Sequence, residues 1–243
     1  LGLDKSVLGQ LGEWISNAIQ GDLGTSLWSG KDVTGIIIDR LPVTFQIAIM
    51  SLTLAIIIGI PIGVISAVKQ NTIIDHFLRI ISVSGLSLPN FWLALILLTG
   101  FSLILNWIPP LGYQPFWENP WVNLQQTILP AICLAIALSA SIVRMTRSAV
   151  LEVLHSEFIR TIRSKGAKER IVIFKHALRN SLVSVITLIG LQVGFLLGGT
   201  VVLESIFSLP GLGSLIFESV LVRDYPIVQA TVLIFGAMFL ITN

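Results

Sequence analysis

Five long stretches without a charged side chain dominate this sequence. Each contains no Asp, Glu, Lys, Arg or His and holds roughly the 20 residues with which an α-helix crosses a hydrocarbon layer. Strands of a membrane barrel would alternate polar and apolar residues, which these stretches do not. The sequence therefore predicts an all-α, polytopic membrane protein with five visible spans. The stretches are Leu41–Val68, Ile80–Asn106, Asn119–Val143, Asn180–Leu203 and Tyr225–Asn243.

The overall composition agrees with this prediction. Only 12% of the residues are charged and 54% are hydrophobic, whereas about a quarter of the residues of soluble proteins are charged. We find no linker. We therefore expect an extracytoplasmic segment over residues 1–43 and one transmembrane domain over residues 44–243, with a loop at residues 144–179.

The basic residues indicate the orientation of the chain. Nine of the fifteen Lys and Arg lie between Arg144 and Arg179, so loop 144–179 is predicted to be cytoplasmic. The link from Lys69 to Arg79 falls on the same side. Residues 1–40 then lie outside, and a segment that starts outside needs something to export it. We therefore expect a further transmembrane helix, the first of six, before Leu1.

The spans lack the residues of a proton relay or a catalytic centre. Ion-coupled transporters usually keep ionisable side chains at membrane depth, and we find none there. No hydrolase elbow, zinc-protease motif, phosphate-binding loop or cysteine cluster is present. Glu204, at the edge of a span, is expected at the membrane interface. We predict neither an enzyme nor a metal site in this chain.

Small and amide side chains within the spans are the candidates for packing and for a solute path. Glycines at intervals of four suit close helix packing, either within the chain or against a second subunit. They are Gly59 and Gly63, and Gly190, Gly194 and Gly198. Gln46, Asn90 and Gln192 could line a translocation path or simply tie helices together.

Loop 144–179 has the pattern of a helix, a turn and a second helix. One apolar helix face is predicted from Phe158, Ile159 and Ile162, and a second from Ile171, Phe174 and Leu178. Gly166 lies between them, where a backbone with positive φ has no steric cost. A basic helix lying on anionic lipid is the alternative to a docking surface for another protein.

The same loop resembles a known motif. Glu157-Phe-Ile-Arg-Thr-Ile-Arg-Ser-Lys-Gly-Ala167, followed by His176-Ala-Leu-Arg-Asn180, is similar to the EAA loop of ABC importer permeases, most closely the dipeptide, oligopeptide and nickel branch. Arg160 takes the place of the motif's Glu, Thr161 and Ile162 replace its two alanines, and Gly166 matches its glycine. Further segments resemble the family in its own order. They are residues 21–26, 40–44, 88–92, 204–213 and 223–226.

The resemblance implies a binding-protein-dependent permease with the type I importer fold, in the bacterial cytoplasmic (inner) membrane. Its partners would be a second permease subunit, two ATPase subunits that carry ATP and Mg, and an extracytoplasmic solute-binding protein. The chain itself would bind no cofactor and no nucleic acid. The solutes would be peptides or similar small molecules, such as nickel complexes or glutathione. The ATPase-coupling residues would be Glu157, Arg160, Thr161, Ile162, Lys165, Gly166 and Ala167.

Three other classes of protein remain as alternatives. A secondary transporter would need a coupling-ion site near mid-membrane and usually an internal repeat, and we find neither. An intramembrane enzyme would need a nucleophile and a base within the spans. A scaffold or receptor that transports nothing is separable only by an uptake assay.

Overall fold

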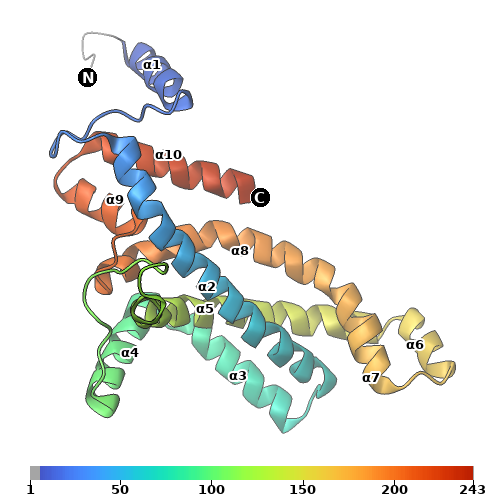
Figure 1. Ribbon diagram of the computed structural model, residues 1–243. Helices are drawn as coiled ribbons and strands as arrows, with labels where there is room; N and C mark the ends of the chain where they lie inside the picture. The colour runs from blue at the N-terminus through green and yellow to red at the C-terminus, as the bar shows by residue number, and fades with distance from the viewer. Residues whose placement is uncertain (1–5, 243) are drawn as a thin grey trace.

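The computed structural model describes residues 6–242, which fold almost entirely into helices (Figure 1). Within them, an isolated bridge between Thr25 and Asp32 is the only extended pairing. The helices are α1 (Val7–Ile19), α2 (Val33–Val68), α3 (Ile73–Ser87), α4 (Asn90–Leu105), α5 (Pro120–Leu154), α6 (Glu157–Ser164), α7 (Glu169–Ile171), the π-helix η1 (Val172–Leu178), α8 (Arg179–Ile206), α9 (Leu212–Leu221) and α10 (Tyr225–Thr242).

Helices α2 and α5 form the centre of the molecule and pack closely where α2 carries glycine. A Cβ added at Gly63 would lie 2.6 Å from Cβ of Thr146, and one at Gly59 would lie 2.8 Å from Cβ of Ile142. Real Cβ atoms do not approach so closely, so larger residues would force the two helices apart. At 36 and 35 residues the helices are about 54 Å long, longer than the hydrocarbon layer is thick.

The five predicted spans correspond to helices, but not to five long ones. Among the described residues, three helices are long and apolar enough to cross a membrane: Val33–Val68, Pro120–Leu154 and Glu169–Gly194. A fourth span results if α3 and α4 count as one, although they meet at 104°. The last stretch forms the shorter apolar helix Tyr225–Ile241. The prediction that each stretch is helical is confirmed, but the helices differ in length more than the sequence predicted.

The break between α3 and α4 has a local cause. Pro89 has no amide hydrogen and disfavours helical geometry in the residue before it. Leu88 accordingly has extended backbone angles, with φ −90° and ψ 126°, and α4 begins at Asn90. Pro42, Pro61 and Pro130 lie inside α2 and α5, which continue through them.

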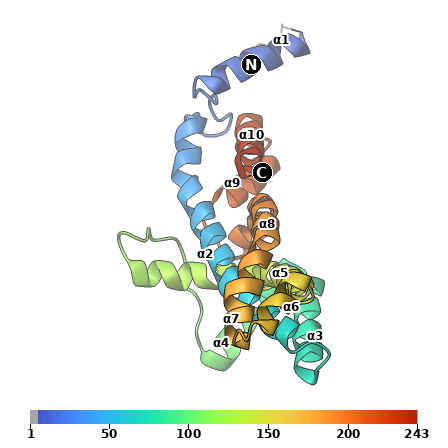
Figure 2. The same ribbon diagram turned by 90° about the vertical axis from the view of Figure 1, so that its right-hand side faces the viewer.

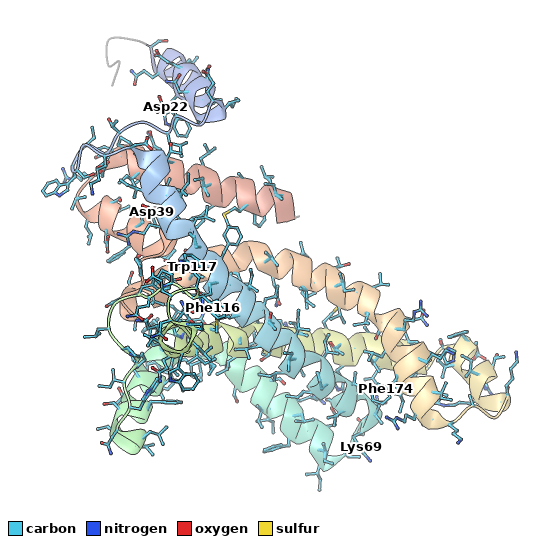
Figure 3. All side chains as sticks on the ribbon, in the orientation of Figure 1. Asp22, Asp39, Lys69, Phe116, Trp117 and Phe174 are labelled. Atoms are coloured by element: carbon cyan, nitrogen blue, oxygen red, sulfur yellow. The ribbon has the colours of Figure 1, made fainter. Side chains whose placement is uncertain are left out.

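The two ends of the molecule differ in character. Figure 3 shows Asp22 and Asp39 toward the end that carries α1, and Lys69 and Phe174 toward the opposite end, where α6 and α7 lie. Figure 2, which views the molecule from that second end, shows α6 and α7 in front of the bundle. We call them the acidic end and the basic end. By the charge rule, the basic end is the predicted cytoplasmic one.

Glu204 was expected at the membrane interface, but it is completely buried in protein. Its Oε1 accepts a hydrogen bond from Oγ1 of Thr44 in α2 at 2.8 Å, and its Oε2 accepts one from the backbone N–H of Ser214 at 3.0 Å. A helix N-terminus, such as that of α9 here, stabilises a carboxylate. Thr44 is 160 positions from Glu204, and Ser214 is 10 positions from it, beyond the turn at Gly211. The hydropathy of the sequence around Glu204 therefore could not reveal its burial.

Candidate functional site

The candidate site is the segment from Glu157 to Ala167 at the basic end. Ser156 caps α6, because its Oγ accepts from the N–H of Ile159 at 3.5 Å, and Glu157 places a negative charge in the first turn. After α6, Gly166 has a φ of +79°. The predicted helix and glycine turn are therefore present in the structure.

An ion pair closes this turn. Nη2 of Arg163 lies 2.5 Å from Oε1 of Glu169, and its Nε lies 3.2 Å from Oε2. The hydrogen bonds to Glu169 raise the pKa of the Arg163 guanidinium above its usual value. Both side chains are largely exposed, which limits what the pair contributes to stability.

Helix α6 is held to the rest of the chain by a small apolar contact. Ile159 is completely buried, and the rings of Phe158 and His176 meet edge to face with centroids 5.9 Å apart. The contact is with η1 rather than with the centre of the bundle. The helix therefore projects from the basic end and is attached to the rest of the chain mainly through η1.

The opposite face of α6 is open. The side chains of Glu157 and Arg160 are 85% and 81% exposed and lie 3.5 Å apart. Of the other candidate residues, Thr161, Lys165 and Gly166 are exposed, and Ile162 and Ala167 are half-buried. The structure thus brings the candidate residues together on one projecting element with mixed charge.

The prediction of the second apolar face was wrong for two of its three residues, since only Leu178 packs against a buried cluster. Ile171 and Phe174 are exposed, whereas Val172 and Ala177 are completely buried. The predicted face assumed α-helical spacing, but residues 172–178 form a π-helix, in which hydrogen bonds join residues five apart. The buried positions are accordingly five residues apart. A π-helix is rare and is often found at functional sites.

The three polar residues proposed for a solute path lie in different helices. Gln46 of α2 is half-buried and bonded within the protein: its Oε1 accepts from the hydroxyl of Tyr113 at 3.1 Å, and its Nε2 donates to Asn123. Asn90 is half-buried at the start of α4. Gln192 of α8 is half-buried, with an Oε1 for which the described residues provide no hydrogen bond.

The glycines fall into two groups. Gly59 and Gly63 face α5, as described above. Gly198 is exposed, with nothing within 4 Å of an added Cβ, and Gly190 and Gly194 are half-buried in the same helix.

Sequence reasoning missed a buried ion pair near the basic end. Asp75 of α3 is completely buried, and it accepts two hydrogen bonds of 2.8 Å from Nε and Nη2 of Arg147 in α5. The two residues are 72 positions apart. The only sequence signal was a single acidic residue within the otherwise basic link from Lys69 to Arg79.

The comparisons with known proteins agree with this architecture. Residues 59–243 match the family described as "binding-protein-dependent transport system inner membrane component". The chain belongs to this family. It is a permease subunit of an ABC importer in the inner membrane, it is not itself an enzyme, and it works with an ATPase and a solute-binding protein.

Individual relatives match over the whole permease sequence. It is 43% identical to a putative peptide transport system permease protein of Brucella abortus and to a glutathione transport system permease protein of Pectobacterium atrosepticum. The corresponding Escherichia coli K12 glutathione permease is 42% identical. Each alignment covers 100% of this chain and 77% of the relative.

Solved structures show the same fold at low sequence identity. An inward-facing structure of the MetNI methionine ABC transporter aligns with a TM-score of 0.69 and 17% identity, covering 85% of this permease and 91% of that chain. An amino acid ABC transporter aligns with a TM-score of 0.67 and 15% identity, covering 86% and 90%.

Proposed function

We propose that this permease pairs with a second permease subunit and two ATPase subunits to import peptides or similar small solutes, including glutathione. The names of the relatives at 42–43% identity support this solute class. The exposed Gly198 of α8 supports a contact with the second permease, since it leaves room for another helix to approach.

The segment Glu157–Ala167 is the ATPase-coupling element in this proposal. The observation that carries it is the projection of α6 from the basic end, with a charged face exposed and only Ile159 completely buried. A surface helix that served only stability would gain little from this arrangement. Docking in a groove of the ATPase would cover Glu157 and Arg160 and would transmit force through η1 and α5.

Residues 1–43 form the extracytoplasmic segment in this proposal. Two residues of this segment bind Asp224, which is buried just before α10: Oγ of Ser26 donates to its carboxylate at 2.5 Å, and the N–H of Leu27 donates at 3.1 Å. This clamp holds the turn before α2 against the far end of the chain. A fixed turn suits docking of the binding protein at the acidic end.

Substitution of Gly166 tests the coupling element. Proline fixes φ near −65° and lacks the N–H that Gly166 donates to the carbonyl of Arg163 at 2.9 Å, so Gly166→Pro cannot keep the turn. We expect this variant to reach the membrane but to lose the ATPase subunits on purification in mild detergent, and to lose uptake of radiolabelled glutathione and dipeptides.

Gly166→Asn is the matched control. Asparagine tolerates positive φ better than other residues with a Cβ, and a Cβ at this position meets nothing within 4 Å. This variant should retain the ATPase subunits and most of the uptake. Full capture of the ATPase by Gly166→Pro would refute the coupling role. Loss of binding to anionic vesicles alone would favour the lipid alternative.

A further inference from the structure

The buried ion pair of Asp75 and Arg147 joins three separate segments. Besides the two bonds from Arg147, the Asp75 carboxylate accepts from Oγ of Ser66 in α2 at 2.5 Å and from the N–H of Asn71 in the α2–α3 turn at 3.0 Å. A bidentate guanidinium–carboxylate contact fixes both distance and orientation. The pair therefore sets the position of the α2–α3 hairpin relative to α5.

Helix α3 has one buried residue, whereas α2 and α5 have many, so its position depends more on a single contact. Asp75 is the only completely buried residue of α3, which exposes most of its apolar side chains. Gly85 supplies a second approach to α5, near Ile136, more than two turns further along. At the basic end, the Asp75 carboxylate is thus the one completely buried side chain through which α3 contacts α5.

The pair also lies close to the coupling element. Arg147 is seven residues before the end of α5 at Leu154, a distance of roughly 10 Å along the helix. Between them, Val150 is buried in a cluster with Val64 and Ala67 of α2 and Ala177 of η1. A movement of α6 and η1 therefore reaches α5 through apolar contacts at the place where Arg147 holds Asp75.

Stability alone does not explain an ion pair in this position. Well-packed apolar residues of similar volume often stabilise a protein as well as a buried pair does, or better, whereas loss of one partner leaves a buried charge. What the pair supplies is a directional link between helices that apolar packing would leave free to slide.

We propose that Asp75 and Arg147 are positioning residues for transport, which make α3 follow α5 when the ATPases move the coupling element. This inference rests on the proposed coupling role of Glu157–Ala167. It assigns a task to two residues that touch neither the ATPase surface of α6 nor the candidate solute-path residues.

The first test compares uptake with ATP hydrolysis in the complete transporter in proteoliposomes, with glutathione and a dipeptide as the transported probes. In Asp75→Asn/Arg147→Gln both charges are removed, so no buried charge is left unpaired. We expect this variant to retain its ATPase subunits and its hydrolysis but to transport at least about tenfold fewer molecules per ATP, a coupling loss of ordinary size for linked sites. Arg79→Gln, which removes an exposed charge from the same helix, is the control with normal transport.

The second test needs no loss of function. Spin labels at His76→Cys in α3 and Lys168→Cys before α7 report the distance between the hairpin and the coupling element; both positions are exposed, and the native Cys133 is buried. With the ion pair intact, we expect this distance to stay constant when ATP and vanadate are added. In the double variant it should change.

The outcomes separate this inference from the proposed function. Normal transport per ATP in the double variant, or a distance that changes while the pair is intact, overturns the positioning role. The proposed function fails separately, if Gly166→Pro retains the ATPase subunits. An uncoupled double variant that still captures its ATPases supports both.

Discussion

Glu204 and Asp75 are completely buried carboxylates, and they are held in different ways. Toward the acidic end, Glu204 is bound by the hydroxyl of Thr44 and by the backbone N–H of Ser214 in the first turn of α9. At the basic end, Asp75 is bound by the guanidinium of Arg147. The N–H of Ser214 is fixed within the backbone of α9, whereas the contact between Asp75 and Arg147 joins two side chains of separate helices. Under the proposed coupling role of α6, we expect the contact of Glu204 to stay fixed and the contact of Asp75 to transmit movement.

Substitution of Glu204 should have the largest effect. Glu204→Ala leaves the N–H of Ser214 and the hydroxyl of Thr44 without their partner and opens a cavity, at a cost of about 3–5 kcal/mol. Thermal unfolding in detergent should show the loss, with little folded protein recovered. Glu204→Gln preserves the shape and should cost less than half as much. Equal stability of Glu204→Ala and the parent would mean that the acidic end is not fixed through this contact.

Substitution of one member of the Asp75–Arg147 pair should come next. Asp75→Ala leaves a partly buried guanidinium without its partner and should cost about 3 kcal/mol. The variant with both Asp75→Ala and Arg147→Ala should recover part of this loss, so a double-mutant cycle on unfolding free energies should give an interaction energy of about 2 kcal/mol. If the losses of unfolding free energy in the two single variants add up to that of the double variant, Asp75 and Arg147 do not interact.

Release of the turn at Ser26 should have a smaller, local effect. Asp224→Asn retains one acceptor oxygen. It loses the negative charge and the second oxygen, which together accept hydrogen bonds from Ser26 and Leu27. We expect a cost of about 1–2 kcal/mol and faster proteolytic cleavage between residues 20 and 32, measured by mass spectrometry. As a control, unfolding of the basic end is followed at an engineered label. It should be unchanged if the effect is local.

The exposed pair at the coupling turn should have the smallest effect on stability. A double-mutant cycle of Arg163→Gln and Glu169→Gln should give less than about 1 kcal/mol, because both side chains reach solvent. Comparison with the cycle for Asp75 and Arg147 separates the two ion pairs at the basic end. Interaction energies of equal size would contradict the distinction drawn here between a buried link and a surface contact.

The sequence predicted those parts of the structure that depend on local properties. Uncharged stretches became helices because apolar side chains and satisfied backbone groups are all that a span requires. The turn at Gly166 was predictable because few other residues adopt positive φ. The cytoplasmic position of α6 stays a prediction, which rests on the basic residues around it.

Other features depend on contacts between distant residues, which a single sequence does not reveal. Asp75 and Arg147 are 72 positions apart, and Thr44 and Glu204 are 160 apart. The π-helix was missed for a different reason, because periodicity arguments assume an α-helix. Val172 and Ala177 are five apart, a spacing that on an α-helix lies on nearly opposite faces.

The π-helix has a consequence for the direction in which the coupling element points. A π-helix holds one residue more than the α-helix that would span the same turns, so η1 amounts to a single inserted residue ahead of α8. Deleting one residue from Val172–Leu178 would close the wide turns into an α-helix and swing everything before them by about 100° around the axis of α8. The chain would keep its spans, its charges and its motif, but we expect α6, the proposed coupling helix, to point in another direction. The one additional residue of η1 thus sets the direction in which α6 projects.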